Sequence, residues 1–145
     1  MGNKSSETAI TDFAHSIGMV VRRVRAAATP QEMSWTESAV LKRLAREGAA
    51  TTAELARMQG MRPQSMRTVV ASLEELGMIA RRPHETDGRQ VVIELTAKGA
   101  SAEKDSGEAK RTWLAQAFAR LDRQERETLF EAGRLMRRLV EGDPE

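Results

Sequence analysis

The chain has 145 residues, which suits one domain, and its 40% apolar and 30% charged residues are typical of a soluble globular protein. It contains no Cys, which excludes disulfides, thiol switches and cysteine-ligated metals, and its formal net charge of +2 is too small to indicate a nucleic-acid partner by itself. No apolar run approaches the roughly 20 residues of a membrane-spanning helix, and the start lacks a signal-peptide core, so we expect a cytoplasmic protein with no membrane partner.

Residues 7–28 are predicted to form a long first helix that ends before Pro30. Its apolar residues recur at steps of three and four, which places them on one face. This face is larger than the core of one small domain needs, so we expect part of it to pack on a partner chain. The residues are Ile10, Phe13, Ile17, Val20, Val21 and Val24.

Two capping-box patterns indicate where the next two helices begin, because a Ser or Thr hydroxyl and a Glu three residues later can satisfy free amides at a helix start. The first, Ser34 with Glu37, predicts a helix that runs to about residue 47. The second, Thr51 with Glu54, predicts a short helix over residues 52–58 that Gly60 ends. In these helices we expect Val40, Leu41, Leu44, Leu55 and Met58 to face the core.

A fourth helix is predicted from Pro63 to Gly77, after a connection short enough for a helix-turn-helix. One stripe is apolar and the exposed face is polar at its start, becoming acidic only at Glu74 and Glu75. This order suits a helix whose N-terminal end enters a DNA major groove, since the acidic end then stays away from phosphates. The apolar stripe is Met66, Val69, Val70, Leu73 and Leu76, and the polar start is Gln64, Ser65, Arg67 and Thr68.

Residues 78–82 and 90–95 are predicted to form a two-stranded hairpin, with a turn at Asp87-Gly88. We expect Val91, Ile93 and Leu95 to share one half-buried face. Thr96 can cap a long helix over residues 97–121, and Asp122 with Glu125 indicates the start of a last helix that stops at Gly142. A helix-turn-helix followed by a basic hairpin is the layout of a winged helix.

Residues 49–99 resemble the MarR family of bacterial transcription regulators. The similarity lies in residues 51–79, in the RRP of residues 81–83, in the DGR of residues 87–89 and in the LTAKG of residues 95–99. The order of the flanking helices also matches. One departure is Arg62, which precedes Pro63 where many relatives have a capping Asp or Ser.

The resemblance implies a mainly α (α+β) fold, a winged helix-turn-helix with long flanking dimerisation helices. Residues 1–145 would be one MarR-like domain, with the winged part at 34–96 and dimerisation helices at 7–30 and 97–145. It also implies a homodimer on a pseudo-palindromic double-stranded DNA operator, with reading helices about 34–36 Å apart. Repression, released by a small and commonly aromatic effector, is the family's usual mode.

The residues we expect to contact DNA are the polar start of the fourth helix, its flanking groups and the basic hairpin. Gln and Arg can read adenine and guanine edges, and Arg at a hairpin tip can enter a narrow minor groove. Asp87 is expected to shape the turn that carries Arg89. The full set is Thr52, Arg62, Gln64, Ser65, Arg67, Thr68, Arg81, Arg82, His84 and Arg89.

The candidates for an effector pocket are Phe13, His15, Met19, Trp35 and Trp113, and the alternative, which we favour, is that these residues form part of a dimer core. We expect no enzyme, cofactor or metal site, because the chain has two His and lacks a nucleophile elbow, a Gly-rich phosphate loop and a metal-spaced cluster. The alternative function is a winged helix that binds protein and not DNA. Such a module would not need Arg both at the reading-helix start and at the wing tip.

Overall fold

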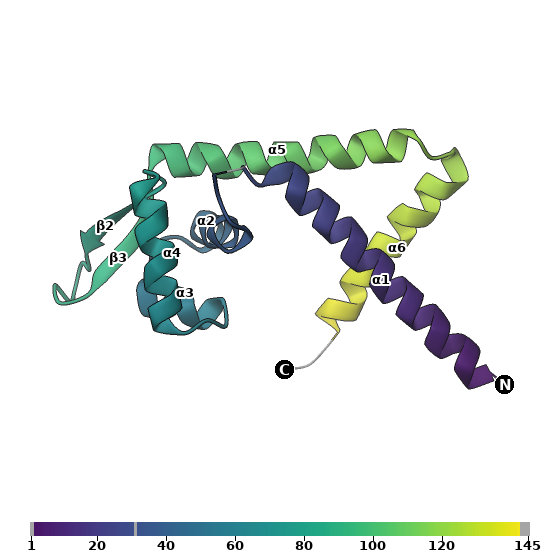
Figure 1. The fold of residues 1–145 in the computed structure, drawn as a ribbon, viewed down its shortest axis with the longest axis horizontal. Helices are drawn as coiled ribbons and strands as arrows, with labels where there is room; N and C mark the ends of the chain where they lie inside the picture. Colours follow the sequence, from purple (N-terminus) through teal and green to yellow (C-terminus); the bar gives the residue numbers. More distant parts are fainter. Residues whose placement is uncertain (1, 31, 143–145) are drawn as a thin grey trace. The chain divides into compact units, whose positions relative to one another are not determined.

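The computed structural model describes residues 2–30 and 32–142, which fall into two compact units, one ending at Lys110 and one beginning at Arg111 (Figure 1). The division of the chain into dimerisation and winged parts stays a prediction. The elements are α1 (Gly2–Ala28), α2 (Trp35–Glu47), β1 (Ala50–Thr51), α3 (Thr52–Met58), α4 (Pro63–Glu75), β2 (Ile79–Pro83), β3 (Val91–Leu95), α5 (Ala97–Ala119) and α6 (Arg123–Glu141).

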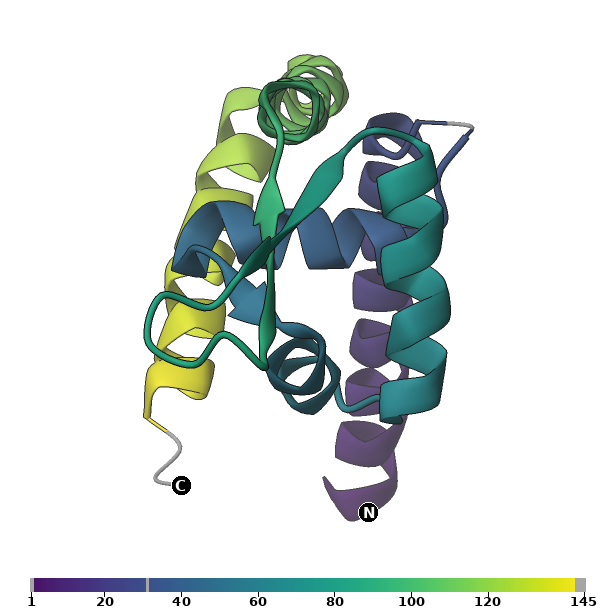
Figure 2. The same ribbon diagram turned by 90° about the vertical axis from the view of Figure 1, so that its left-hand side faces the viewer.

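The winged part is built on a core shared by three helices and a small sheet. Figure 2 looks onto the hairpin, which crosses in front of α2 while α4 stands beside it. Most of the predicted inward residues are buried here together with Ile79 and Ile93 from the sheet, namely Val40, Leu41, Leu44, Leu55, Met66, Val70 and Leu73, while Val69 and Leu76 are half-buried against this core. The seven largest fully buried side chains are Leu41, Leu55, Met66, Leu73, Ile93, Val40 and Val70. The mainly α winged helix-turn-helix fold is therefore confirmed.

The three helix starts predicted from capping boxes are confirmed by their hydrogen bonds. In α2 the Glu37 amide donates to Ser34 Oγ at 3.1 Å, and the Ser34 amide donates to Glu37 Oε2 at 2.8 Å. The same reciprocal pair caps α3 through Thr51 and caps α6 through Asp122. Because each cap satisfies amides that the helix leaves free, the three helices begin at fixed residues.

Helices α3 and α4, which form the helix-turn-helix, end in the same way. Gly60 has φ 62° and Gly77 has φ 74°, the left-handed region that favours glycine. After each glycine the next amide reaches back five residues, from Met61 to the Ala56 carbonyl and from Met78 to the Leu73 carbonyl. These Schellman endings turn the chain sharply, so α4 starts only five residues after α3 stops.

The sheet has three strands in the order β1-β3-β2, all antiparallel, and the two-stranded prediction was incomplete. β1 has only two residues, and it exists because Ala50 pairs with Ile93 and Thr51 with Val92. Each strand of the hairpin begins one residue later than predicted. Val91, expected on the half-buried face, is 45% exposed, whereas Val92 lies between its pairing partners Thr51 of β1 and Arg82 of β2 and is 6% exposed.

Two further expectations were wrong in detail. The first helix begins at Gly2 rather than at residue 7, so its polar start is helical. Met58 was expected in the core but is 38% exposed, because it is the last residue of α3 and the core stripe of that helix is Leu55 and Ala56.

The start of α5 is fastened to the end of α4, which explains the LTAKG stretch. Thr96 Oγ1 donates to the Gly77 carbonyl at 2.6 Å and accepts from the Gly99 amide at 3.1 Å. Lys98 Nζ donates to the Leu76 carbonyl at 2.8 Å. A Cβ on Gly99 would lie 2.0 Å from the Met78 carbonyl oxygen, so only glycine permits this approach. We call these contacts the α4–α5 clamp.

The unit that begins at Arg111 contains the last nine residues of α5 and all of α6. The rings of Phe118 and Phe130 lie 5.2 Å apart at 48°, which joins the two helices near their connection. No residue of α6 is buried. Five of its large apolar side chains are exposed, namely Leu129, Phe130, Leu135, Leu139 and Val140, which leaves this helix with a large apolar surface of its own.

Candidate nucleic-acid interface

Helix α4 has one buried side and one exposed polar side, as the sequence predicts. Met66, Val70 and Leu73 are fully buried and hold the helix against the core. The polar groups at its start are all exposed, namely Gln64, Ser65, Arg67 and Thr68. Within residues 2–30 and 32–142 the only side-chain hydrogen bond among these four is from Thr68 Oγ1 to the Gln64 carbonyl at 3.5 Å. Their donors and acceptors are therefore available to a ligand.

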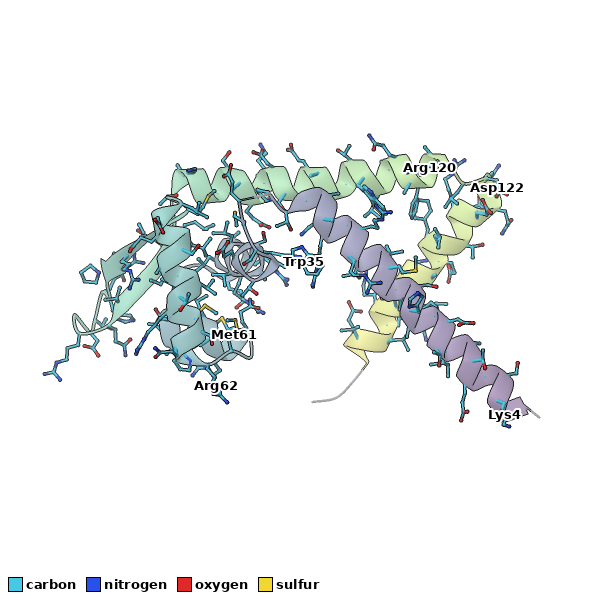
Figure 3. All side chains as sticks on the ribbon, viewed as in Figure 1. Lys4, Trp35, Met61, Arg62, Arg120 and Asp122 are labelled. Atoms are coloured by element: carbon cyan, nitrogen blue, oxygen red, sulfur yellow. The ribbon has the colours of Figure 1, made fainter. Side chains whose placement is uncertain are left out.

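The first turn of α4 presents positive charge together with free amides. Arg62 is the N-cap, with φ −70° and ψ 144°, and makes no side-chain capping bond, which confirms that its cap is weaker than an Asp or Ser would be. Figure 3 shows Arg62 at the end of α4 farthest from α5. A helix start whose amides are not capped by a side chain, next to a guanidinium, attracts anions such as phosphate.

The tip of the wing is a turn that displays Arg89. The Gln90 amide donates to the Asp87 carbonyl at 3.0 Å, and the Arg89 amide donates to Asp87 Oδ1 at 3.1 Å. The expectation that Asp87 shapes this turn is confirmed. The Arg89 side chain is exposed and makes no ion pair within the described chain, so its guanidinium is free to reach outward.

His84 holds the base of the same loop. Its Nδ1 accepts hydrogen bonds from the Thr86 and Asp87 amides, each at 3.2 Å, and its own amide donates to the Gln90 carbonyl at 2.9 Å. With Nδ1 accepting, only Nε2 remains for an outside partner. The histidine is thus a positioning residue for the wing, and its contact with DNA stays a prediction.

The two hairpin arginines lie on opposite faces of β2, as predicted, and each has an internal carboxylate partner. Arg81 Nε lies 2.9 Å from Glu74 Oε2, and Arg82 Nε lies 2.7 Å from Glu94 Oε2. Their charge is partly neutralised, in contrast to Arg62, Arg67 and Arg89. Thr52 is half-buried at the first turn of α3. The roles of these residues toward DNA stay predictions.

Of the expected effector residues, Trp35 lines a cavity in the described part of the chain. This cavity has a volume of about 440 Å³, and Figure 3 shows Trp35 on the side of α2 away from the wing. The guanidinium of Arg25 lies 5.8 Å from the centre of the Trp35 ring, a cation–π distance. Phe13, His15 and Met19 are exposed on α1 and do not line the cavity, and Trp113 belongs to the other unit.

Sequence reasoning missed the basic and hydroxyl groups of the same cavity. Lys42 and Ser38 follow Trp35 on one face of α2, at steps of three and four, so the helical spacing could have indicated them. Arg25 and Lys110 come from α1 and α5, and only the tertiary fold brings them there. Ser38 Oγ is buried and has no hydrogen-bond partner within the described chain.

Glu103 is a carboxyl group close to the lysines of this cavity, and its pKa departs from the ordinary value. Burial raises the pKa of Glu103 above its ordinary value, and the charges of Lys110 and Lys42 act in the opposite direction. The ionised form of Glu103 is thus held near two lysines but incompletely solvated.

Among the described residues no helix is long and apolar enough to cross a membrane, and no group of three or more acidic or His side chains is placed to hold a metal ion.

Comparison with known proteins places this geometry among transcription regulators. The sequence pattern of the MarR family matches residues 31–90. The uncharacterized HTH-type transcriptional regulator Mb0904 of Mycobacterium bovis is 37% identical over 92% of this chain and 94% of its own. The HTH-type transcriptional repressor Rv2887 of Mycobacterium tuberculosis is 35% identical over 74% and 78%. A MarR family protein from Bacillus stearothermophilus has the same fold, with TM-score 0.79, 22% identity and coverage of 98% and 97%.

Proposed function

Because the chain belongs to the MarR family of transcription regulators, we propose that it acts as a homodimer that reads a pseudo-palindromic DNA operator. The observation that carries the proposal is the set of polar groups that the fold leaves unused at the start of α4 and at the wing tip. Gln64 and Arg67 would read base edges, while Ser65 and Thr68 would support them.

The remaining contacts follow from charge. Arg62 would bind phosphate at the start of α4, and Thr52 would do so at the start of α3. Arg89 would enter the minor groove beside the reading helix. Arg81, Arg82 and His84 would make weaker backbone contacts, since each already makes an internal hydrogen bond or ion pair.

Dimerisation is supported by apolar surface that a monomer would leave in water. Ile10 is 68% exposed on α1 and Val140 is 78% exposed on α6, with Phe13, Val20, Phe130 and Leu139 also exposed. Contiguous exposed apolar residues on two long helices are typical of a subunit interface. A closed two-fold pair would bury these faces and present two reading helices to a duplex.

Repression with release by an aromatic effector is our proposal for the mode of action. The relative Rv2887 is named a repressor, and the cavity at Trp35 offers an aromatic face beside cations. An effector would work by preferring a dimer whose reading helices are misplaced for DNA, and its effect is limited by that difference in affinity.

The test is selection of bound duplexes from a random DNA pool, followed by a salt titration of the selected site. We expect a palindrome and a steep fall of affinity with salt, because contacts to several phosphates release counterions. A winged module that binds only protein would select no sequence and show no binding even at low salt, and that result would refute the proposal.

A further inference from the structure

The cavity at Trp35 continues along α2 into a second hollow. The second hollow has a volume of about 200 Å³ and shares three lining residues with the first, Ala39, Lys42 and Gln59. It adds Arg43 and Arg46, which lie one and two turns further along the same helix face than Ala39. The two hollows therefore form one groove, which we call the α2 groove, from Trp35 to Arg46.

The α2 groove carries more positive than negative charge. Arg25, Lys42, Arg46 and Lys110 line it, and none of them makes a salt bridge within residues 2–30 and 32–142. The fifth cation of the groove, Arg43, is paired with Glu47 at 2.9 Å, and Glu103 is the other carboxyl close to these cations. A single carboxylate from a ligand would leave most of this charge uncompensated.

The groove also has two groups that a purely electrostatic surface does not need. Trp35 is partly exposed and offers a flat ring, which Arg25 covers at 5.8 Å. Ser38 lines the wall beside it, and its buried Oγ lacks a hydrogen-bond partner among the described residues. A ring stacked near Trp35 would therefore lie beside the wall that Ser38 lines.

The spacing of these groups sets the shape of the ligand. Lys42 lies seven residues after Trp35 and Arg46 lies eleven, which corresponds to about 10 Å and about 16 Å along the helix. Cations at increasing distance from an aromatic ring fit a ligand whose negative charges are spaced along a tail. A compact aromatic acid would not extend from Trp35 as far as Arg46.

We propose that the α2 groove binds an aromatic ring carrying an oligophosphate tail, with the ring at Trp35 and the phosphates beside Lys42 and Arg46. This inference rests on the effector site of the proposed function and specifies its chemical class. The assay below contains no DNA, so it can succeed or fail independently of operator binding.

The test is a titration of Trp35 fluorescence in the full-length Trp113→Phe protein, at constant ionic strength and without Mg²⁺. The probes are adenosine, AMP, ATP, tripolyphosphate and benzoate. We expect ATP to bind at least tenfold more tightly than AMP, and AMP more tightly than adenosine or benzoate. Calorimetry on the unsubstituted chain should give the same order, which removes any dependence on the Trp113 substitution.

Substitutions in the α2 groove test where the oligophosphate tail binds. Arg46→Gln should lower ATP affinity about tenfold and leave AMP unchanged, whereas Lys42→Gln should weaken both. The matched control is Arg57→Gln, which removes an exposed cation from α3 that lines neither hollow. Circular dichroism establishes that each variant is folded.

Four results would overturn the proposal. They are benzoate binding more tightly than ATP, tripolyphosphate binding as tightly as ATP, no binding of any probe at millimolar concentration, and an ATP to AMP ratio unaffected by Arg46→Gln. If Arg46→Gln weakens operator binding and leaves ATP affinity intact, the cations belong to a DNA backbone contact and the ligand assignment is wrong.

Discussion

Replacement of Gly99 by Ala should damage the α4–α5 clamp. The added Cβ would lie 2.0 Å from the Met78 carbonyl oxygen, whereas ordinary contact begins at 3.4 Å. The first turn of α5 would have to move away from Met78 by more than 1 Å. The clashing atom belongs to the backbone, so a change of side-chain rotamer cannot relieve the clash. The nearby bonds, from the Thr96 amide to the Met78 carbonyl and from Thr96 Oγ1 to the Gly77 carbonyl, would lengthen.

The size of the effect follows from these contacts. Steric strain from an added methyl costs about 1–3 kcal/mol. Two or three weakened hydrogen bonds cost about 1 kcal/mol each, and the gain in helix propensity of Ala over Gly offsets about 1 kcal/mol. We expect a net loss of about 3 kcal/mol in the free energy of unfolding and a fall in Tm of roughly 6–12 °C.

The assay is urea unfolding followed by circular dichroism, at one fixed protein concentration because a dimer's stability depends on it. The matched control is Gly133→Ala in α6, where a Cβ would meet nothing within 4 Å. That variant should be stabilised by about 0.5–1 kcal/mol. A Gly99→Ala protein within 1 kcal/mol of the parent would show that the close approach has no energetic weight.

Three other outcomes are expected. Arg89→Ala should weaken operator binding about tenfold by fluorescence anisotropy without changing Tm, and unchanged affinity at physiological salt would remove the wing from the mechanism. Deletion of residues 1–28 should abolish the dimer in light scattering, and a DNA-competent monomer would contradict the assembly. Glu103→Gln should raise the free energy of unfolding at pH 7 but not at pH 4. Burial raises the pKa of the Glu103 carboxyl, so its contribution to stability is lost as pH rises through that pKa. An equal effect of the substitution at both pH values would disprove this.

Much of the fold could be predicted because the relevant signals are local. The capping residues Ser34, Thr51 and Asp122 bond to amides three positions away, so the sequence alone contains both partners. Strand β1 could not be predicted in this way. Ala50 and Thr51 form a strand only through pairing with β3, about forty residues later, where Thr51 lies opposite the buried Val92.

The candidate site shows the same difference between features set by local sequence and features set by contacts between distant residues. The exposed face of α4 was predicted from helical spacing, and its side chains lie where that spacing put them. The internal ion pairs of Arg81 and Arg82 depend on Glu74 and Glu94, which are brought close by the hairpin and by its packing on α4. The cavity at Trp35 gathers Arg25 and Lys110 from distant helices, so its charged lining depends on tertiary packing that sequence spacing does not encode. An effector role for Phe13, His15, Met19 and Trp113 stays a prediction.

The α4–α5 clamp has a mechanical consequence. Carbonyl oxygens of Leu76 and Gly77 are held by side chains of the first turn of α5, and the backbone of Gly99 leaves no slack between the two segments. We therefore expect α4 and the beginning of α5 to move together as one rigid unit. We expect a small rotation at this contact to move the far end of α4, where Arg62 and Gln64 lie.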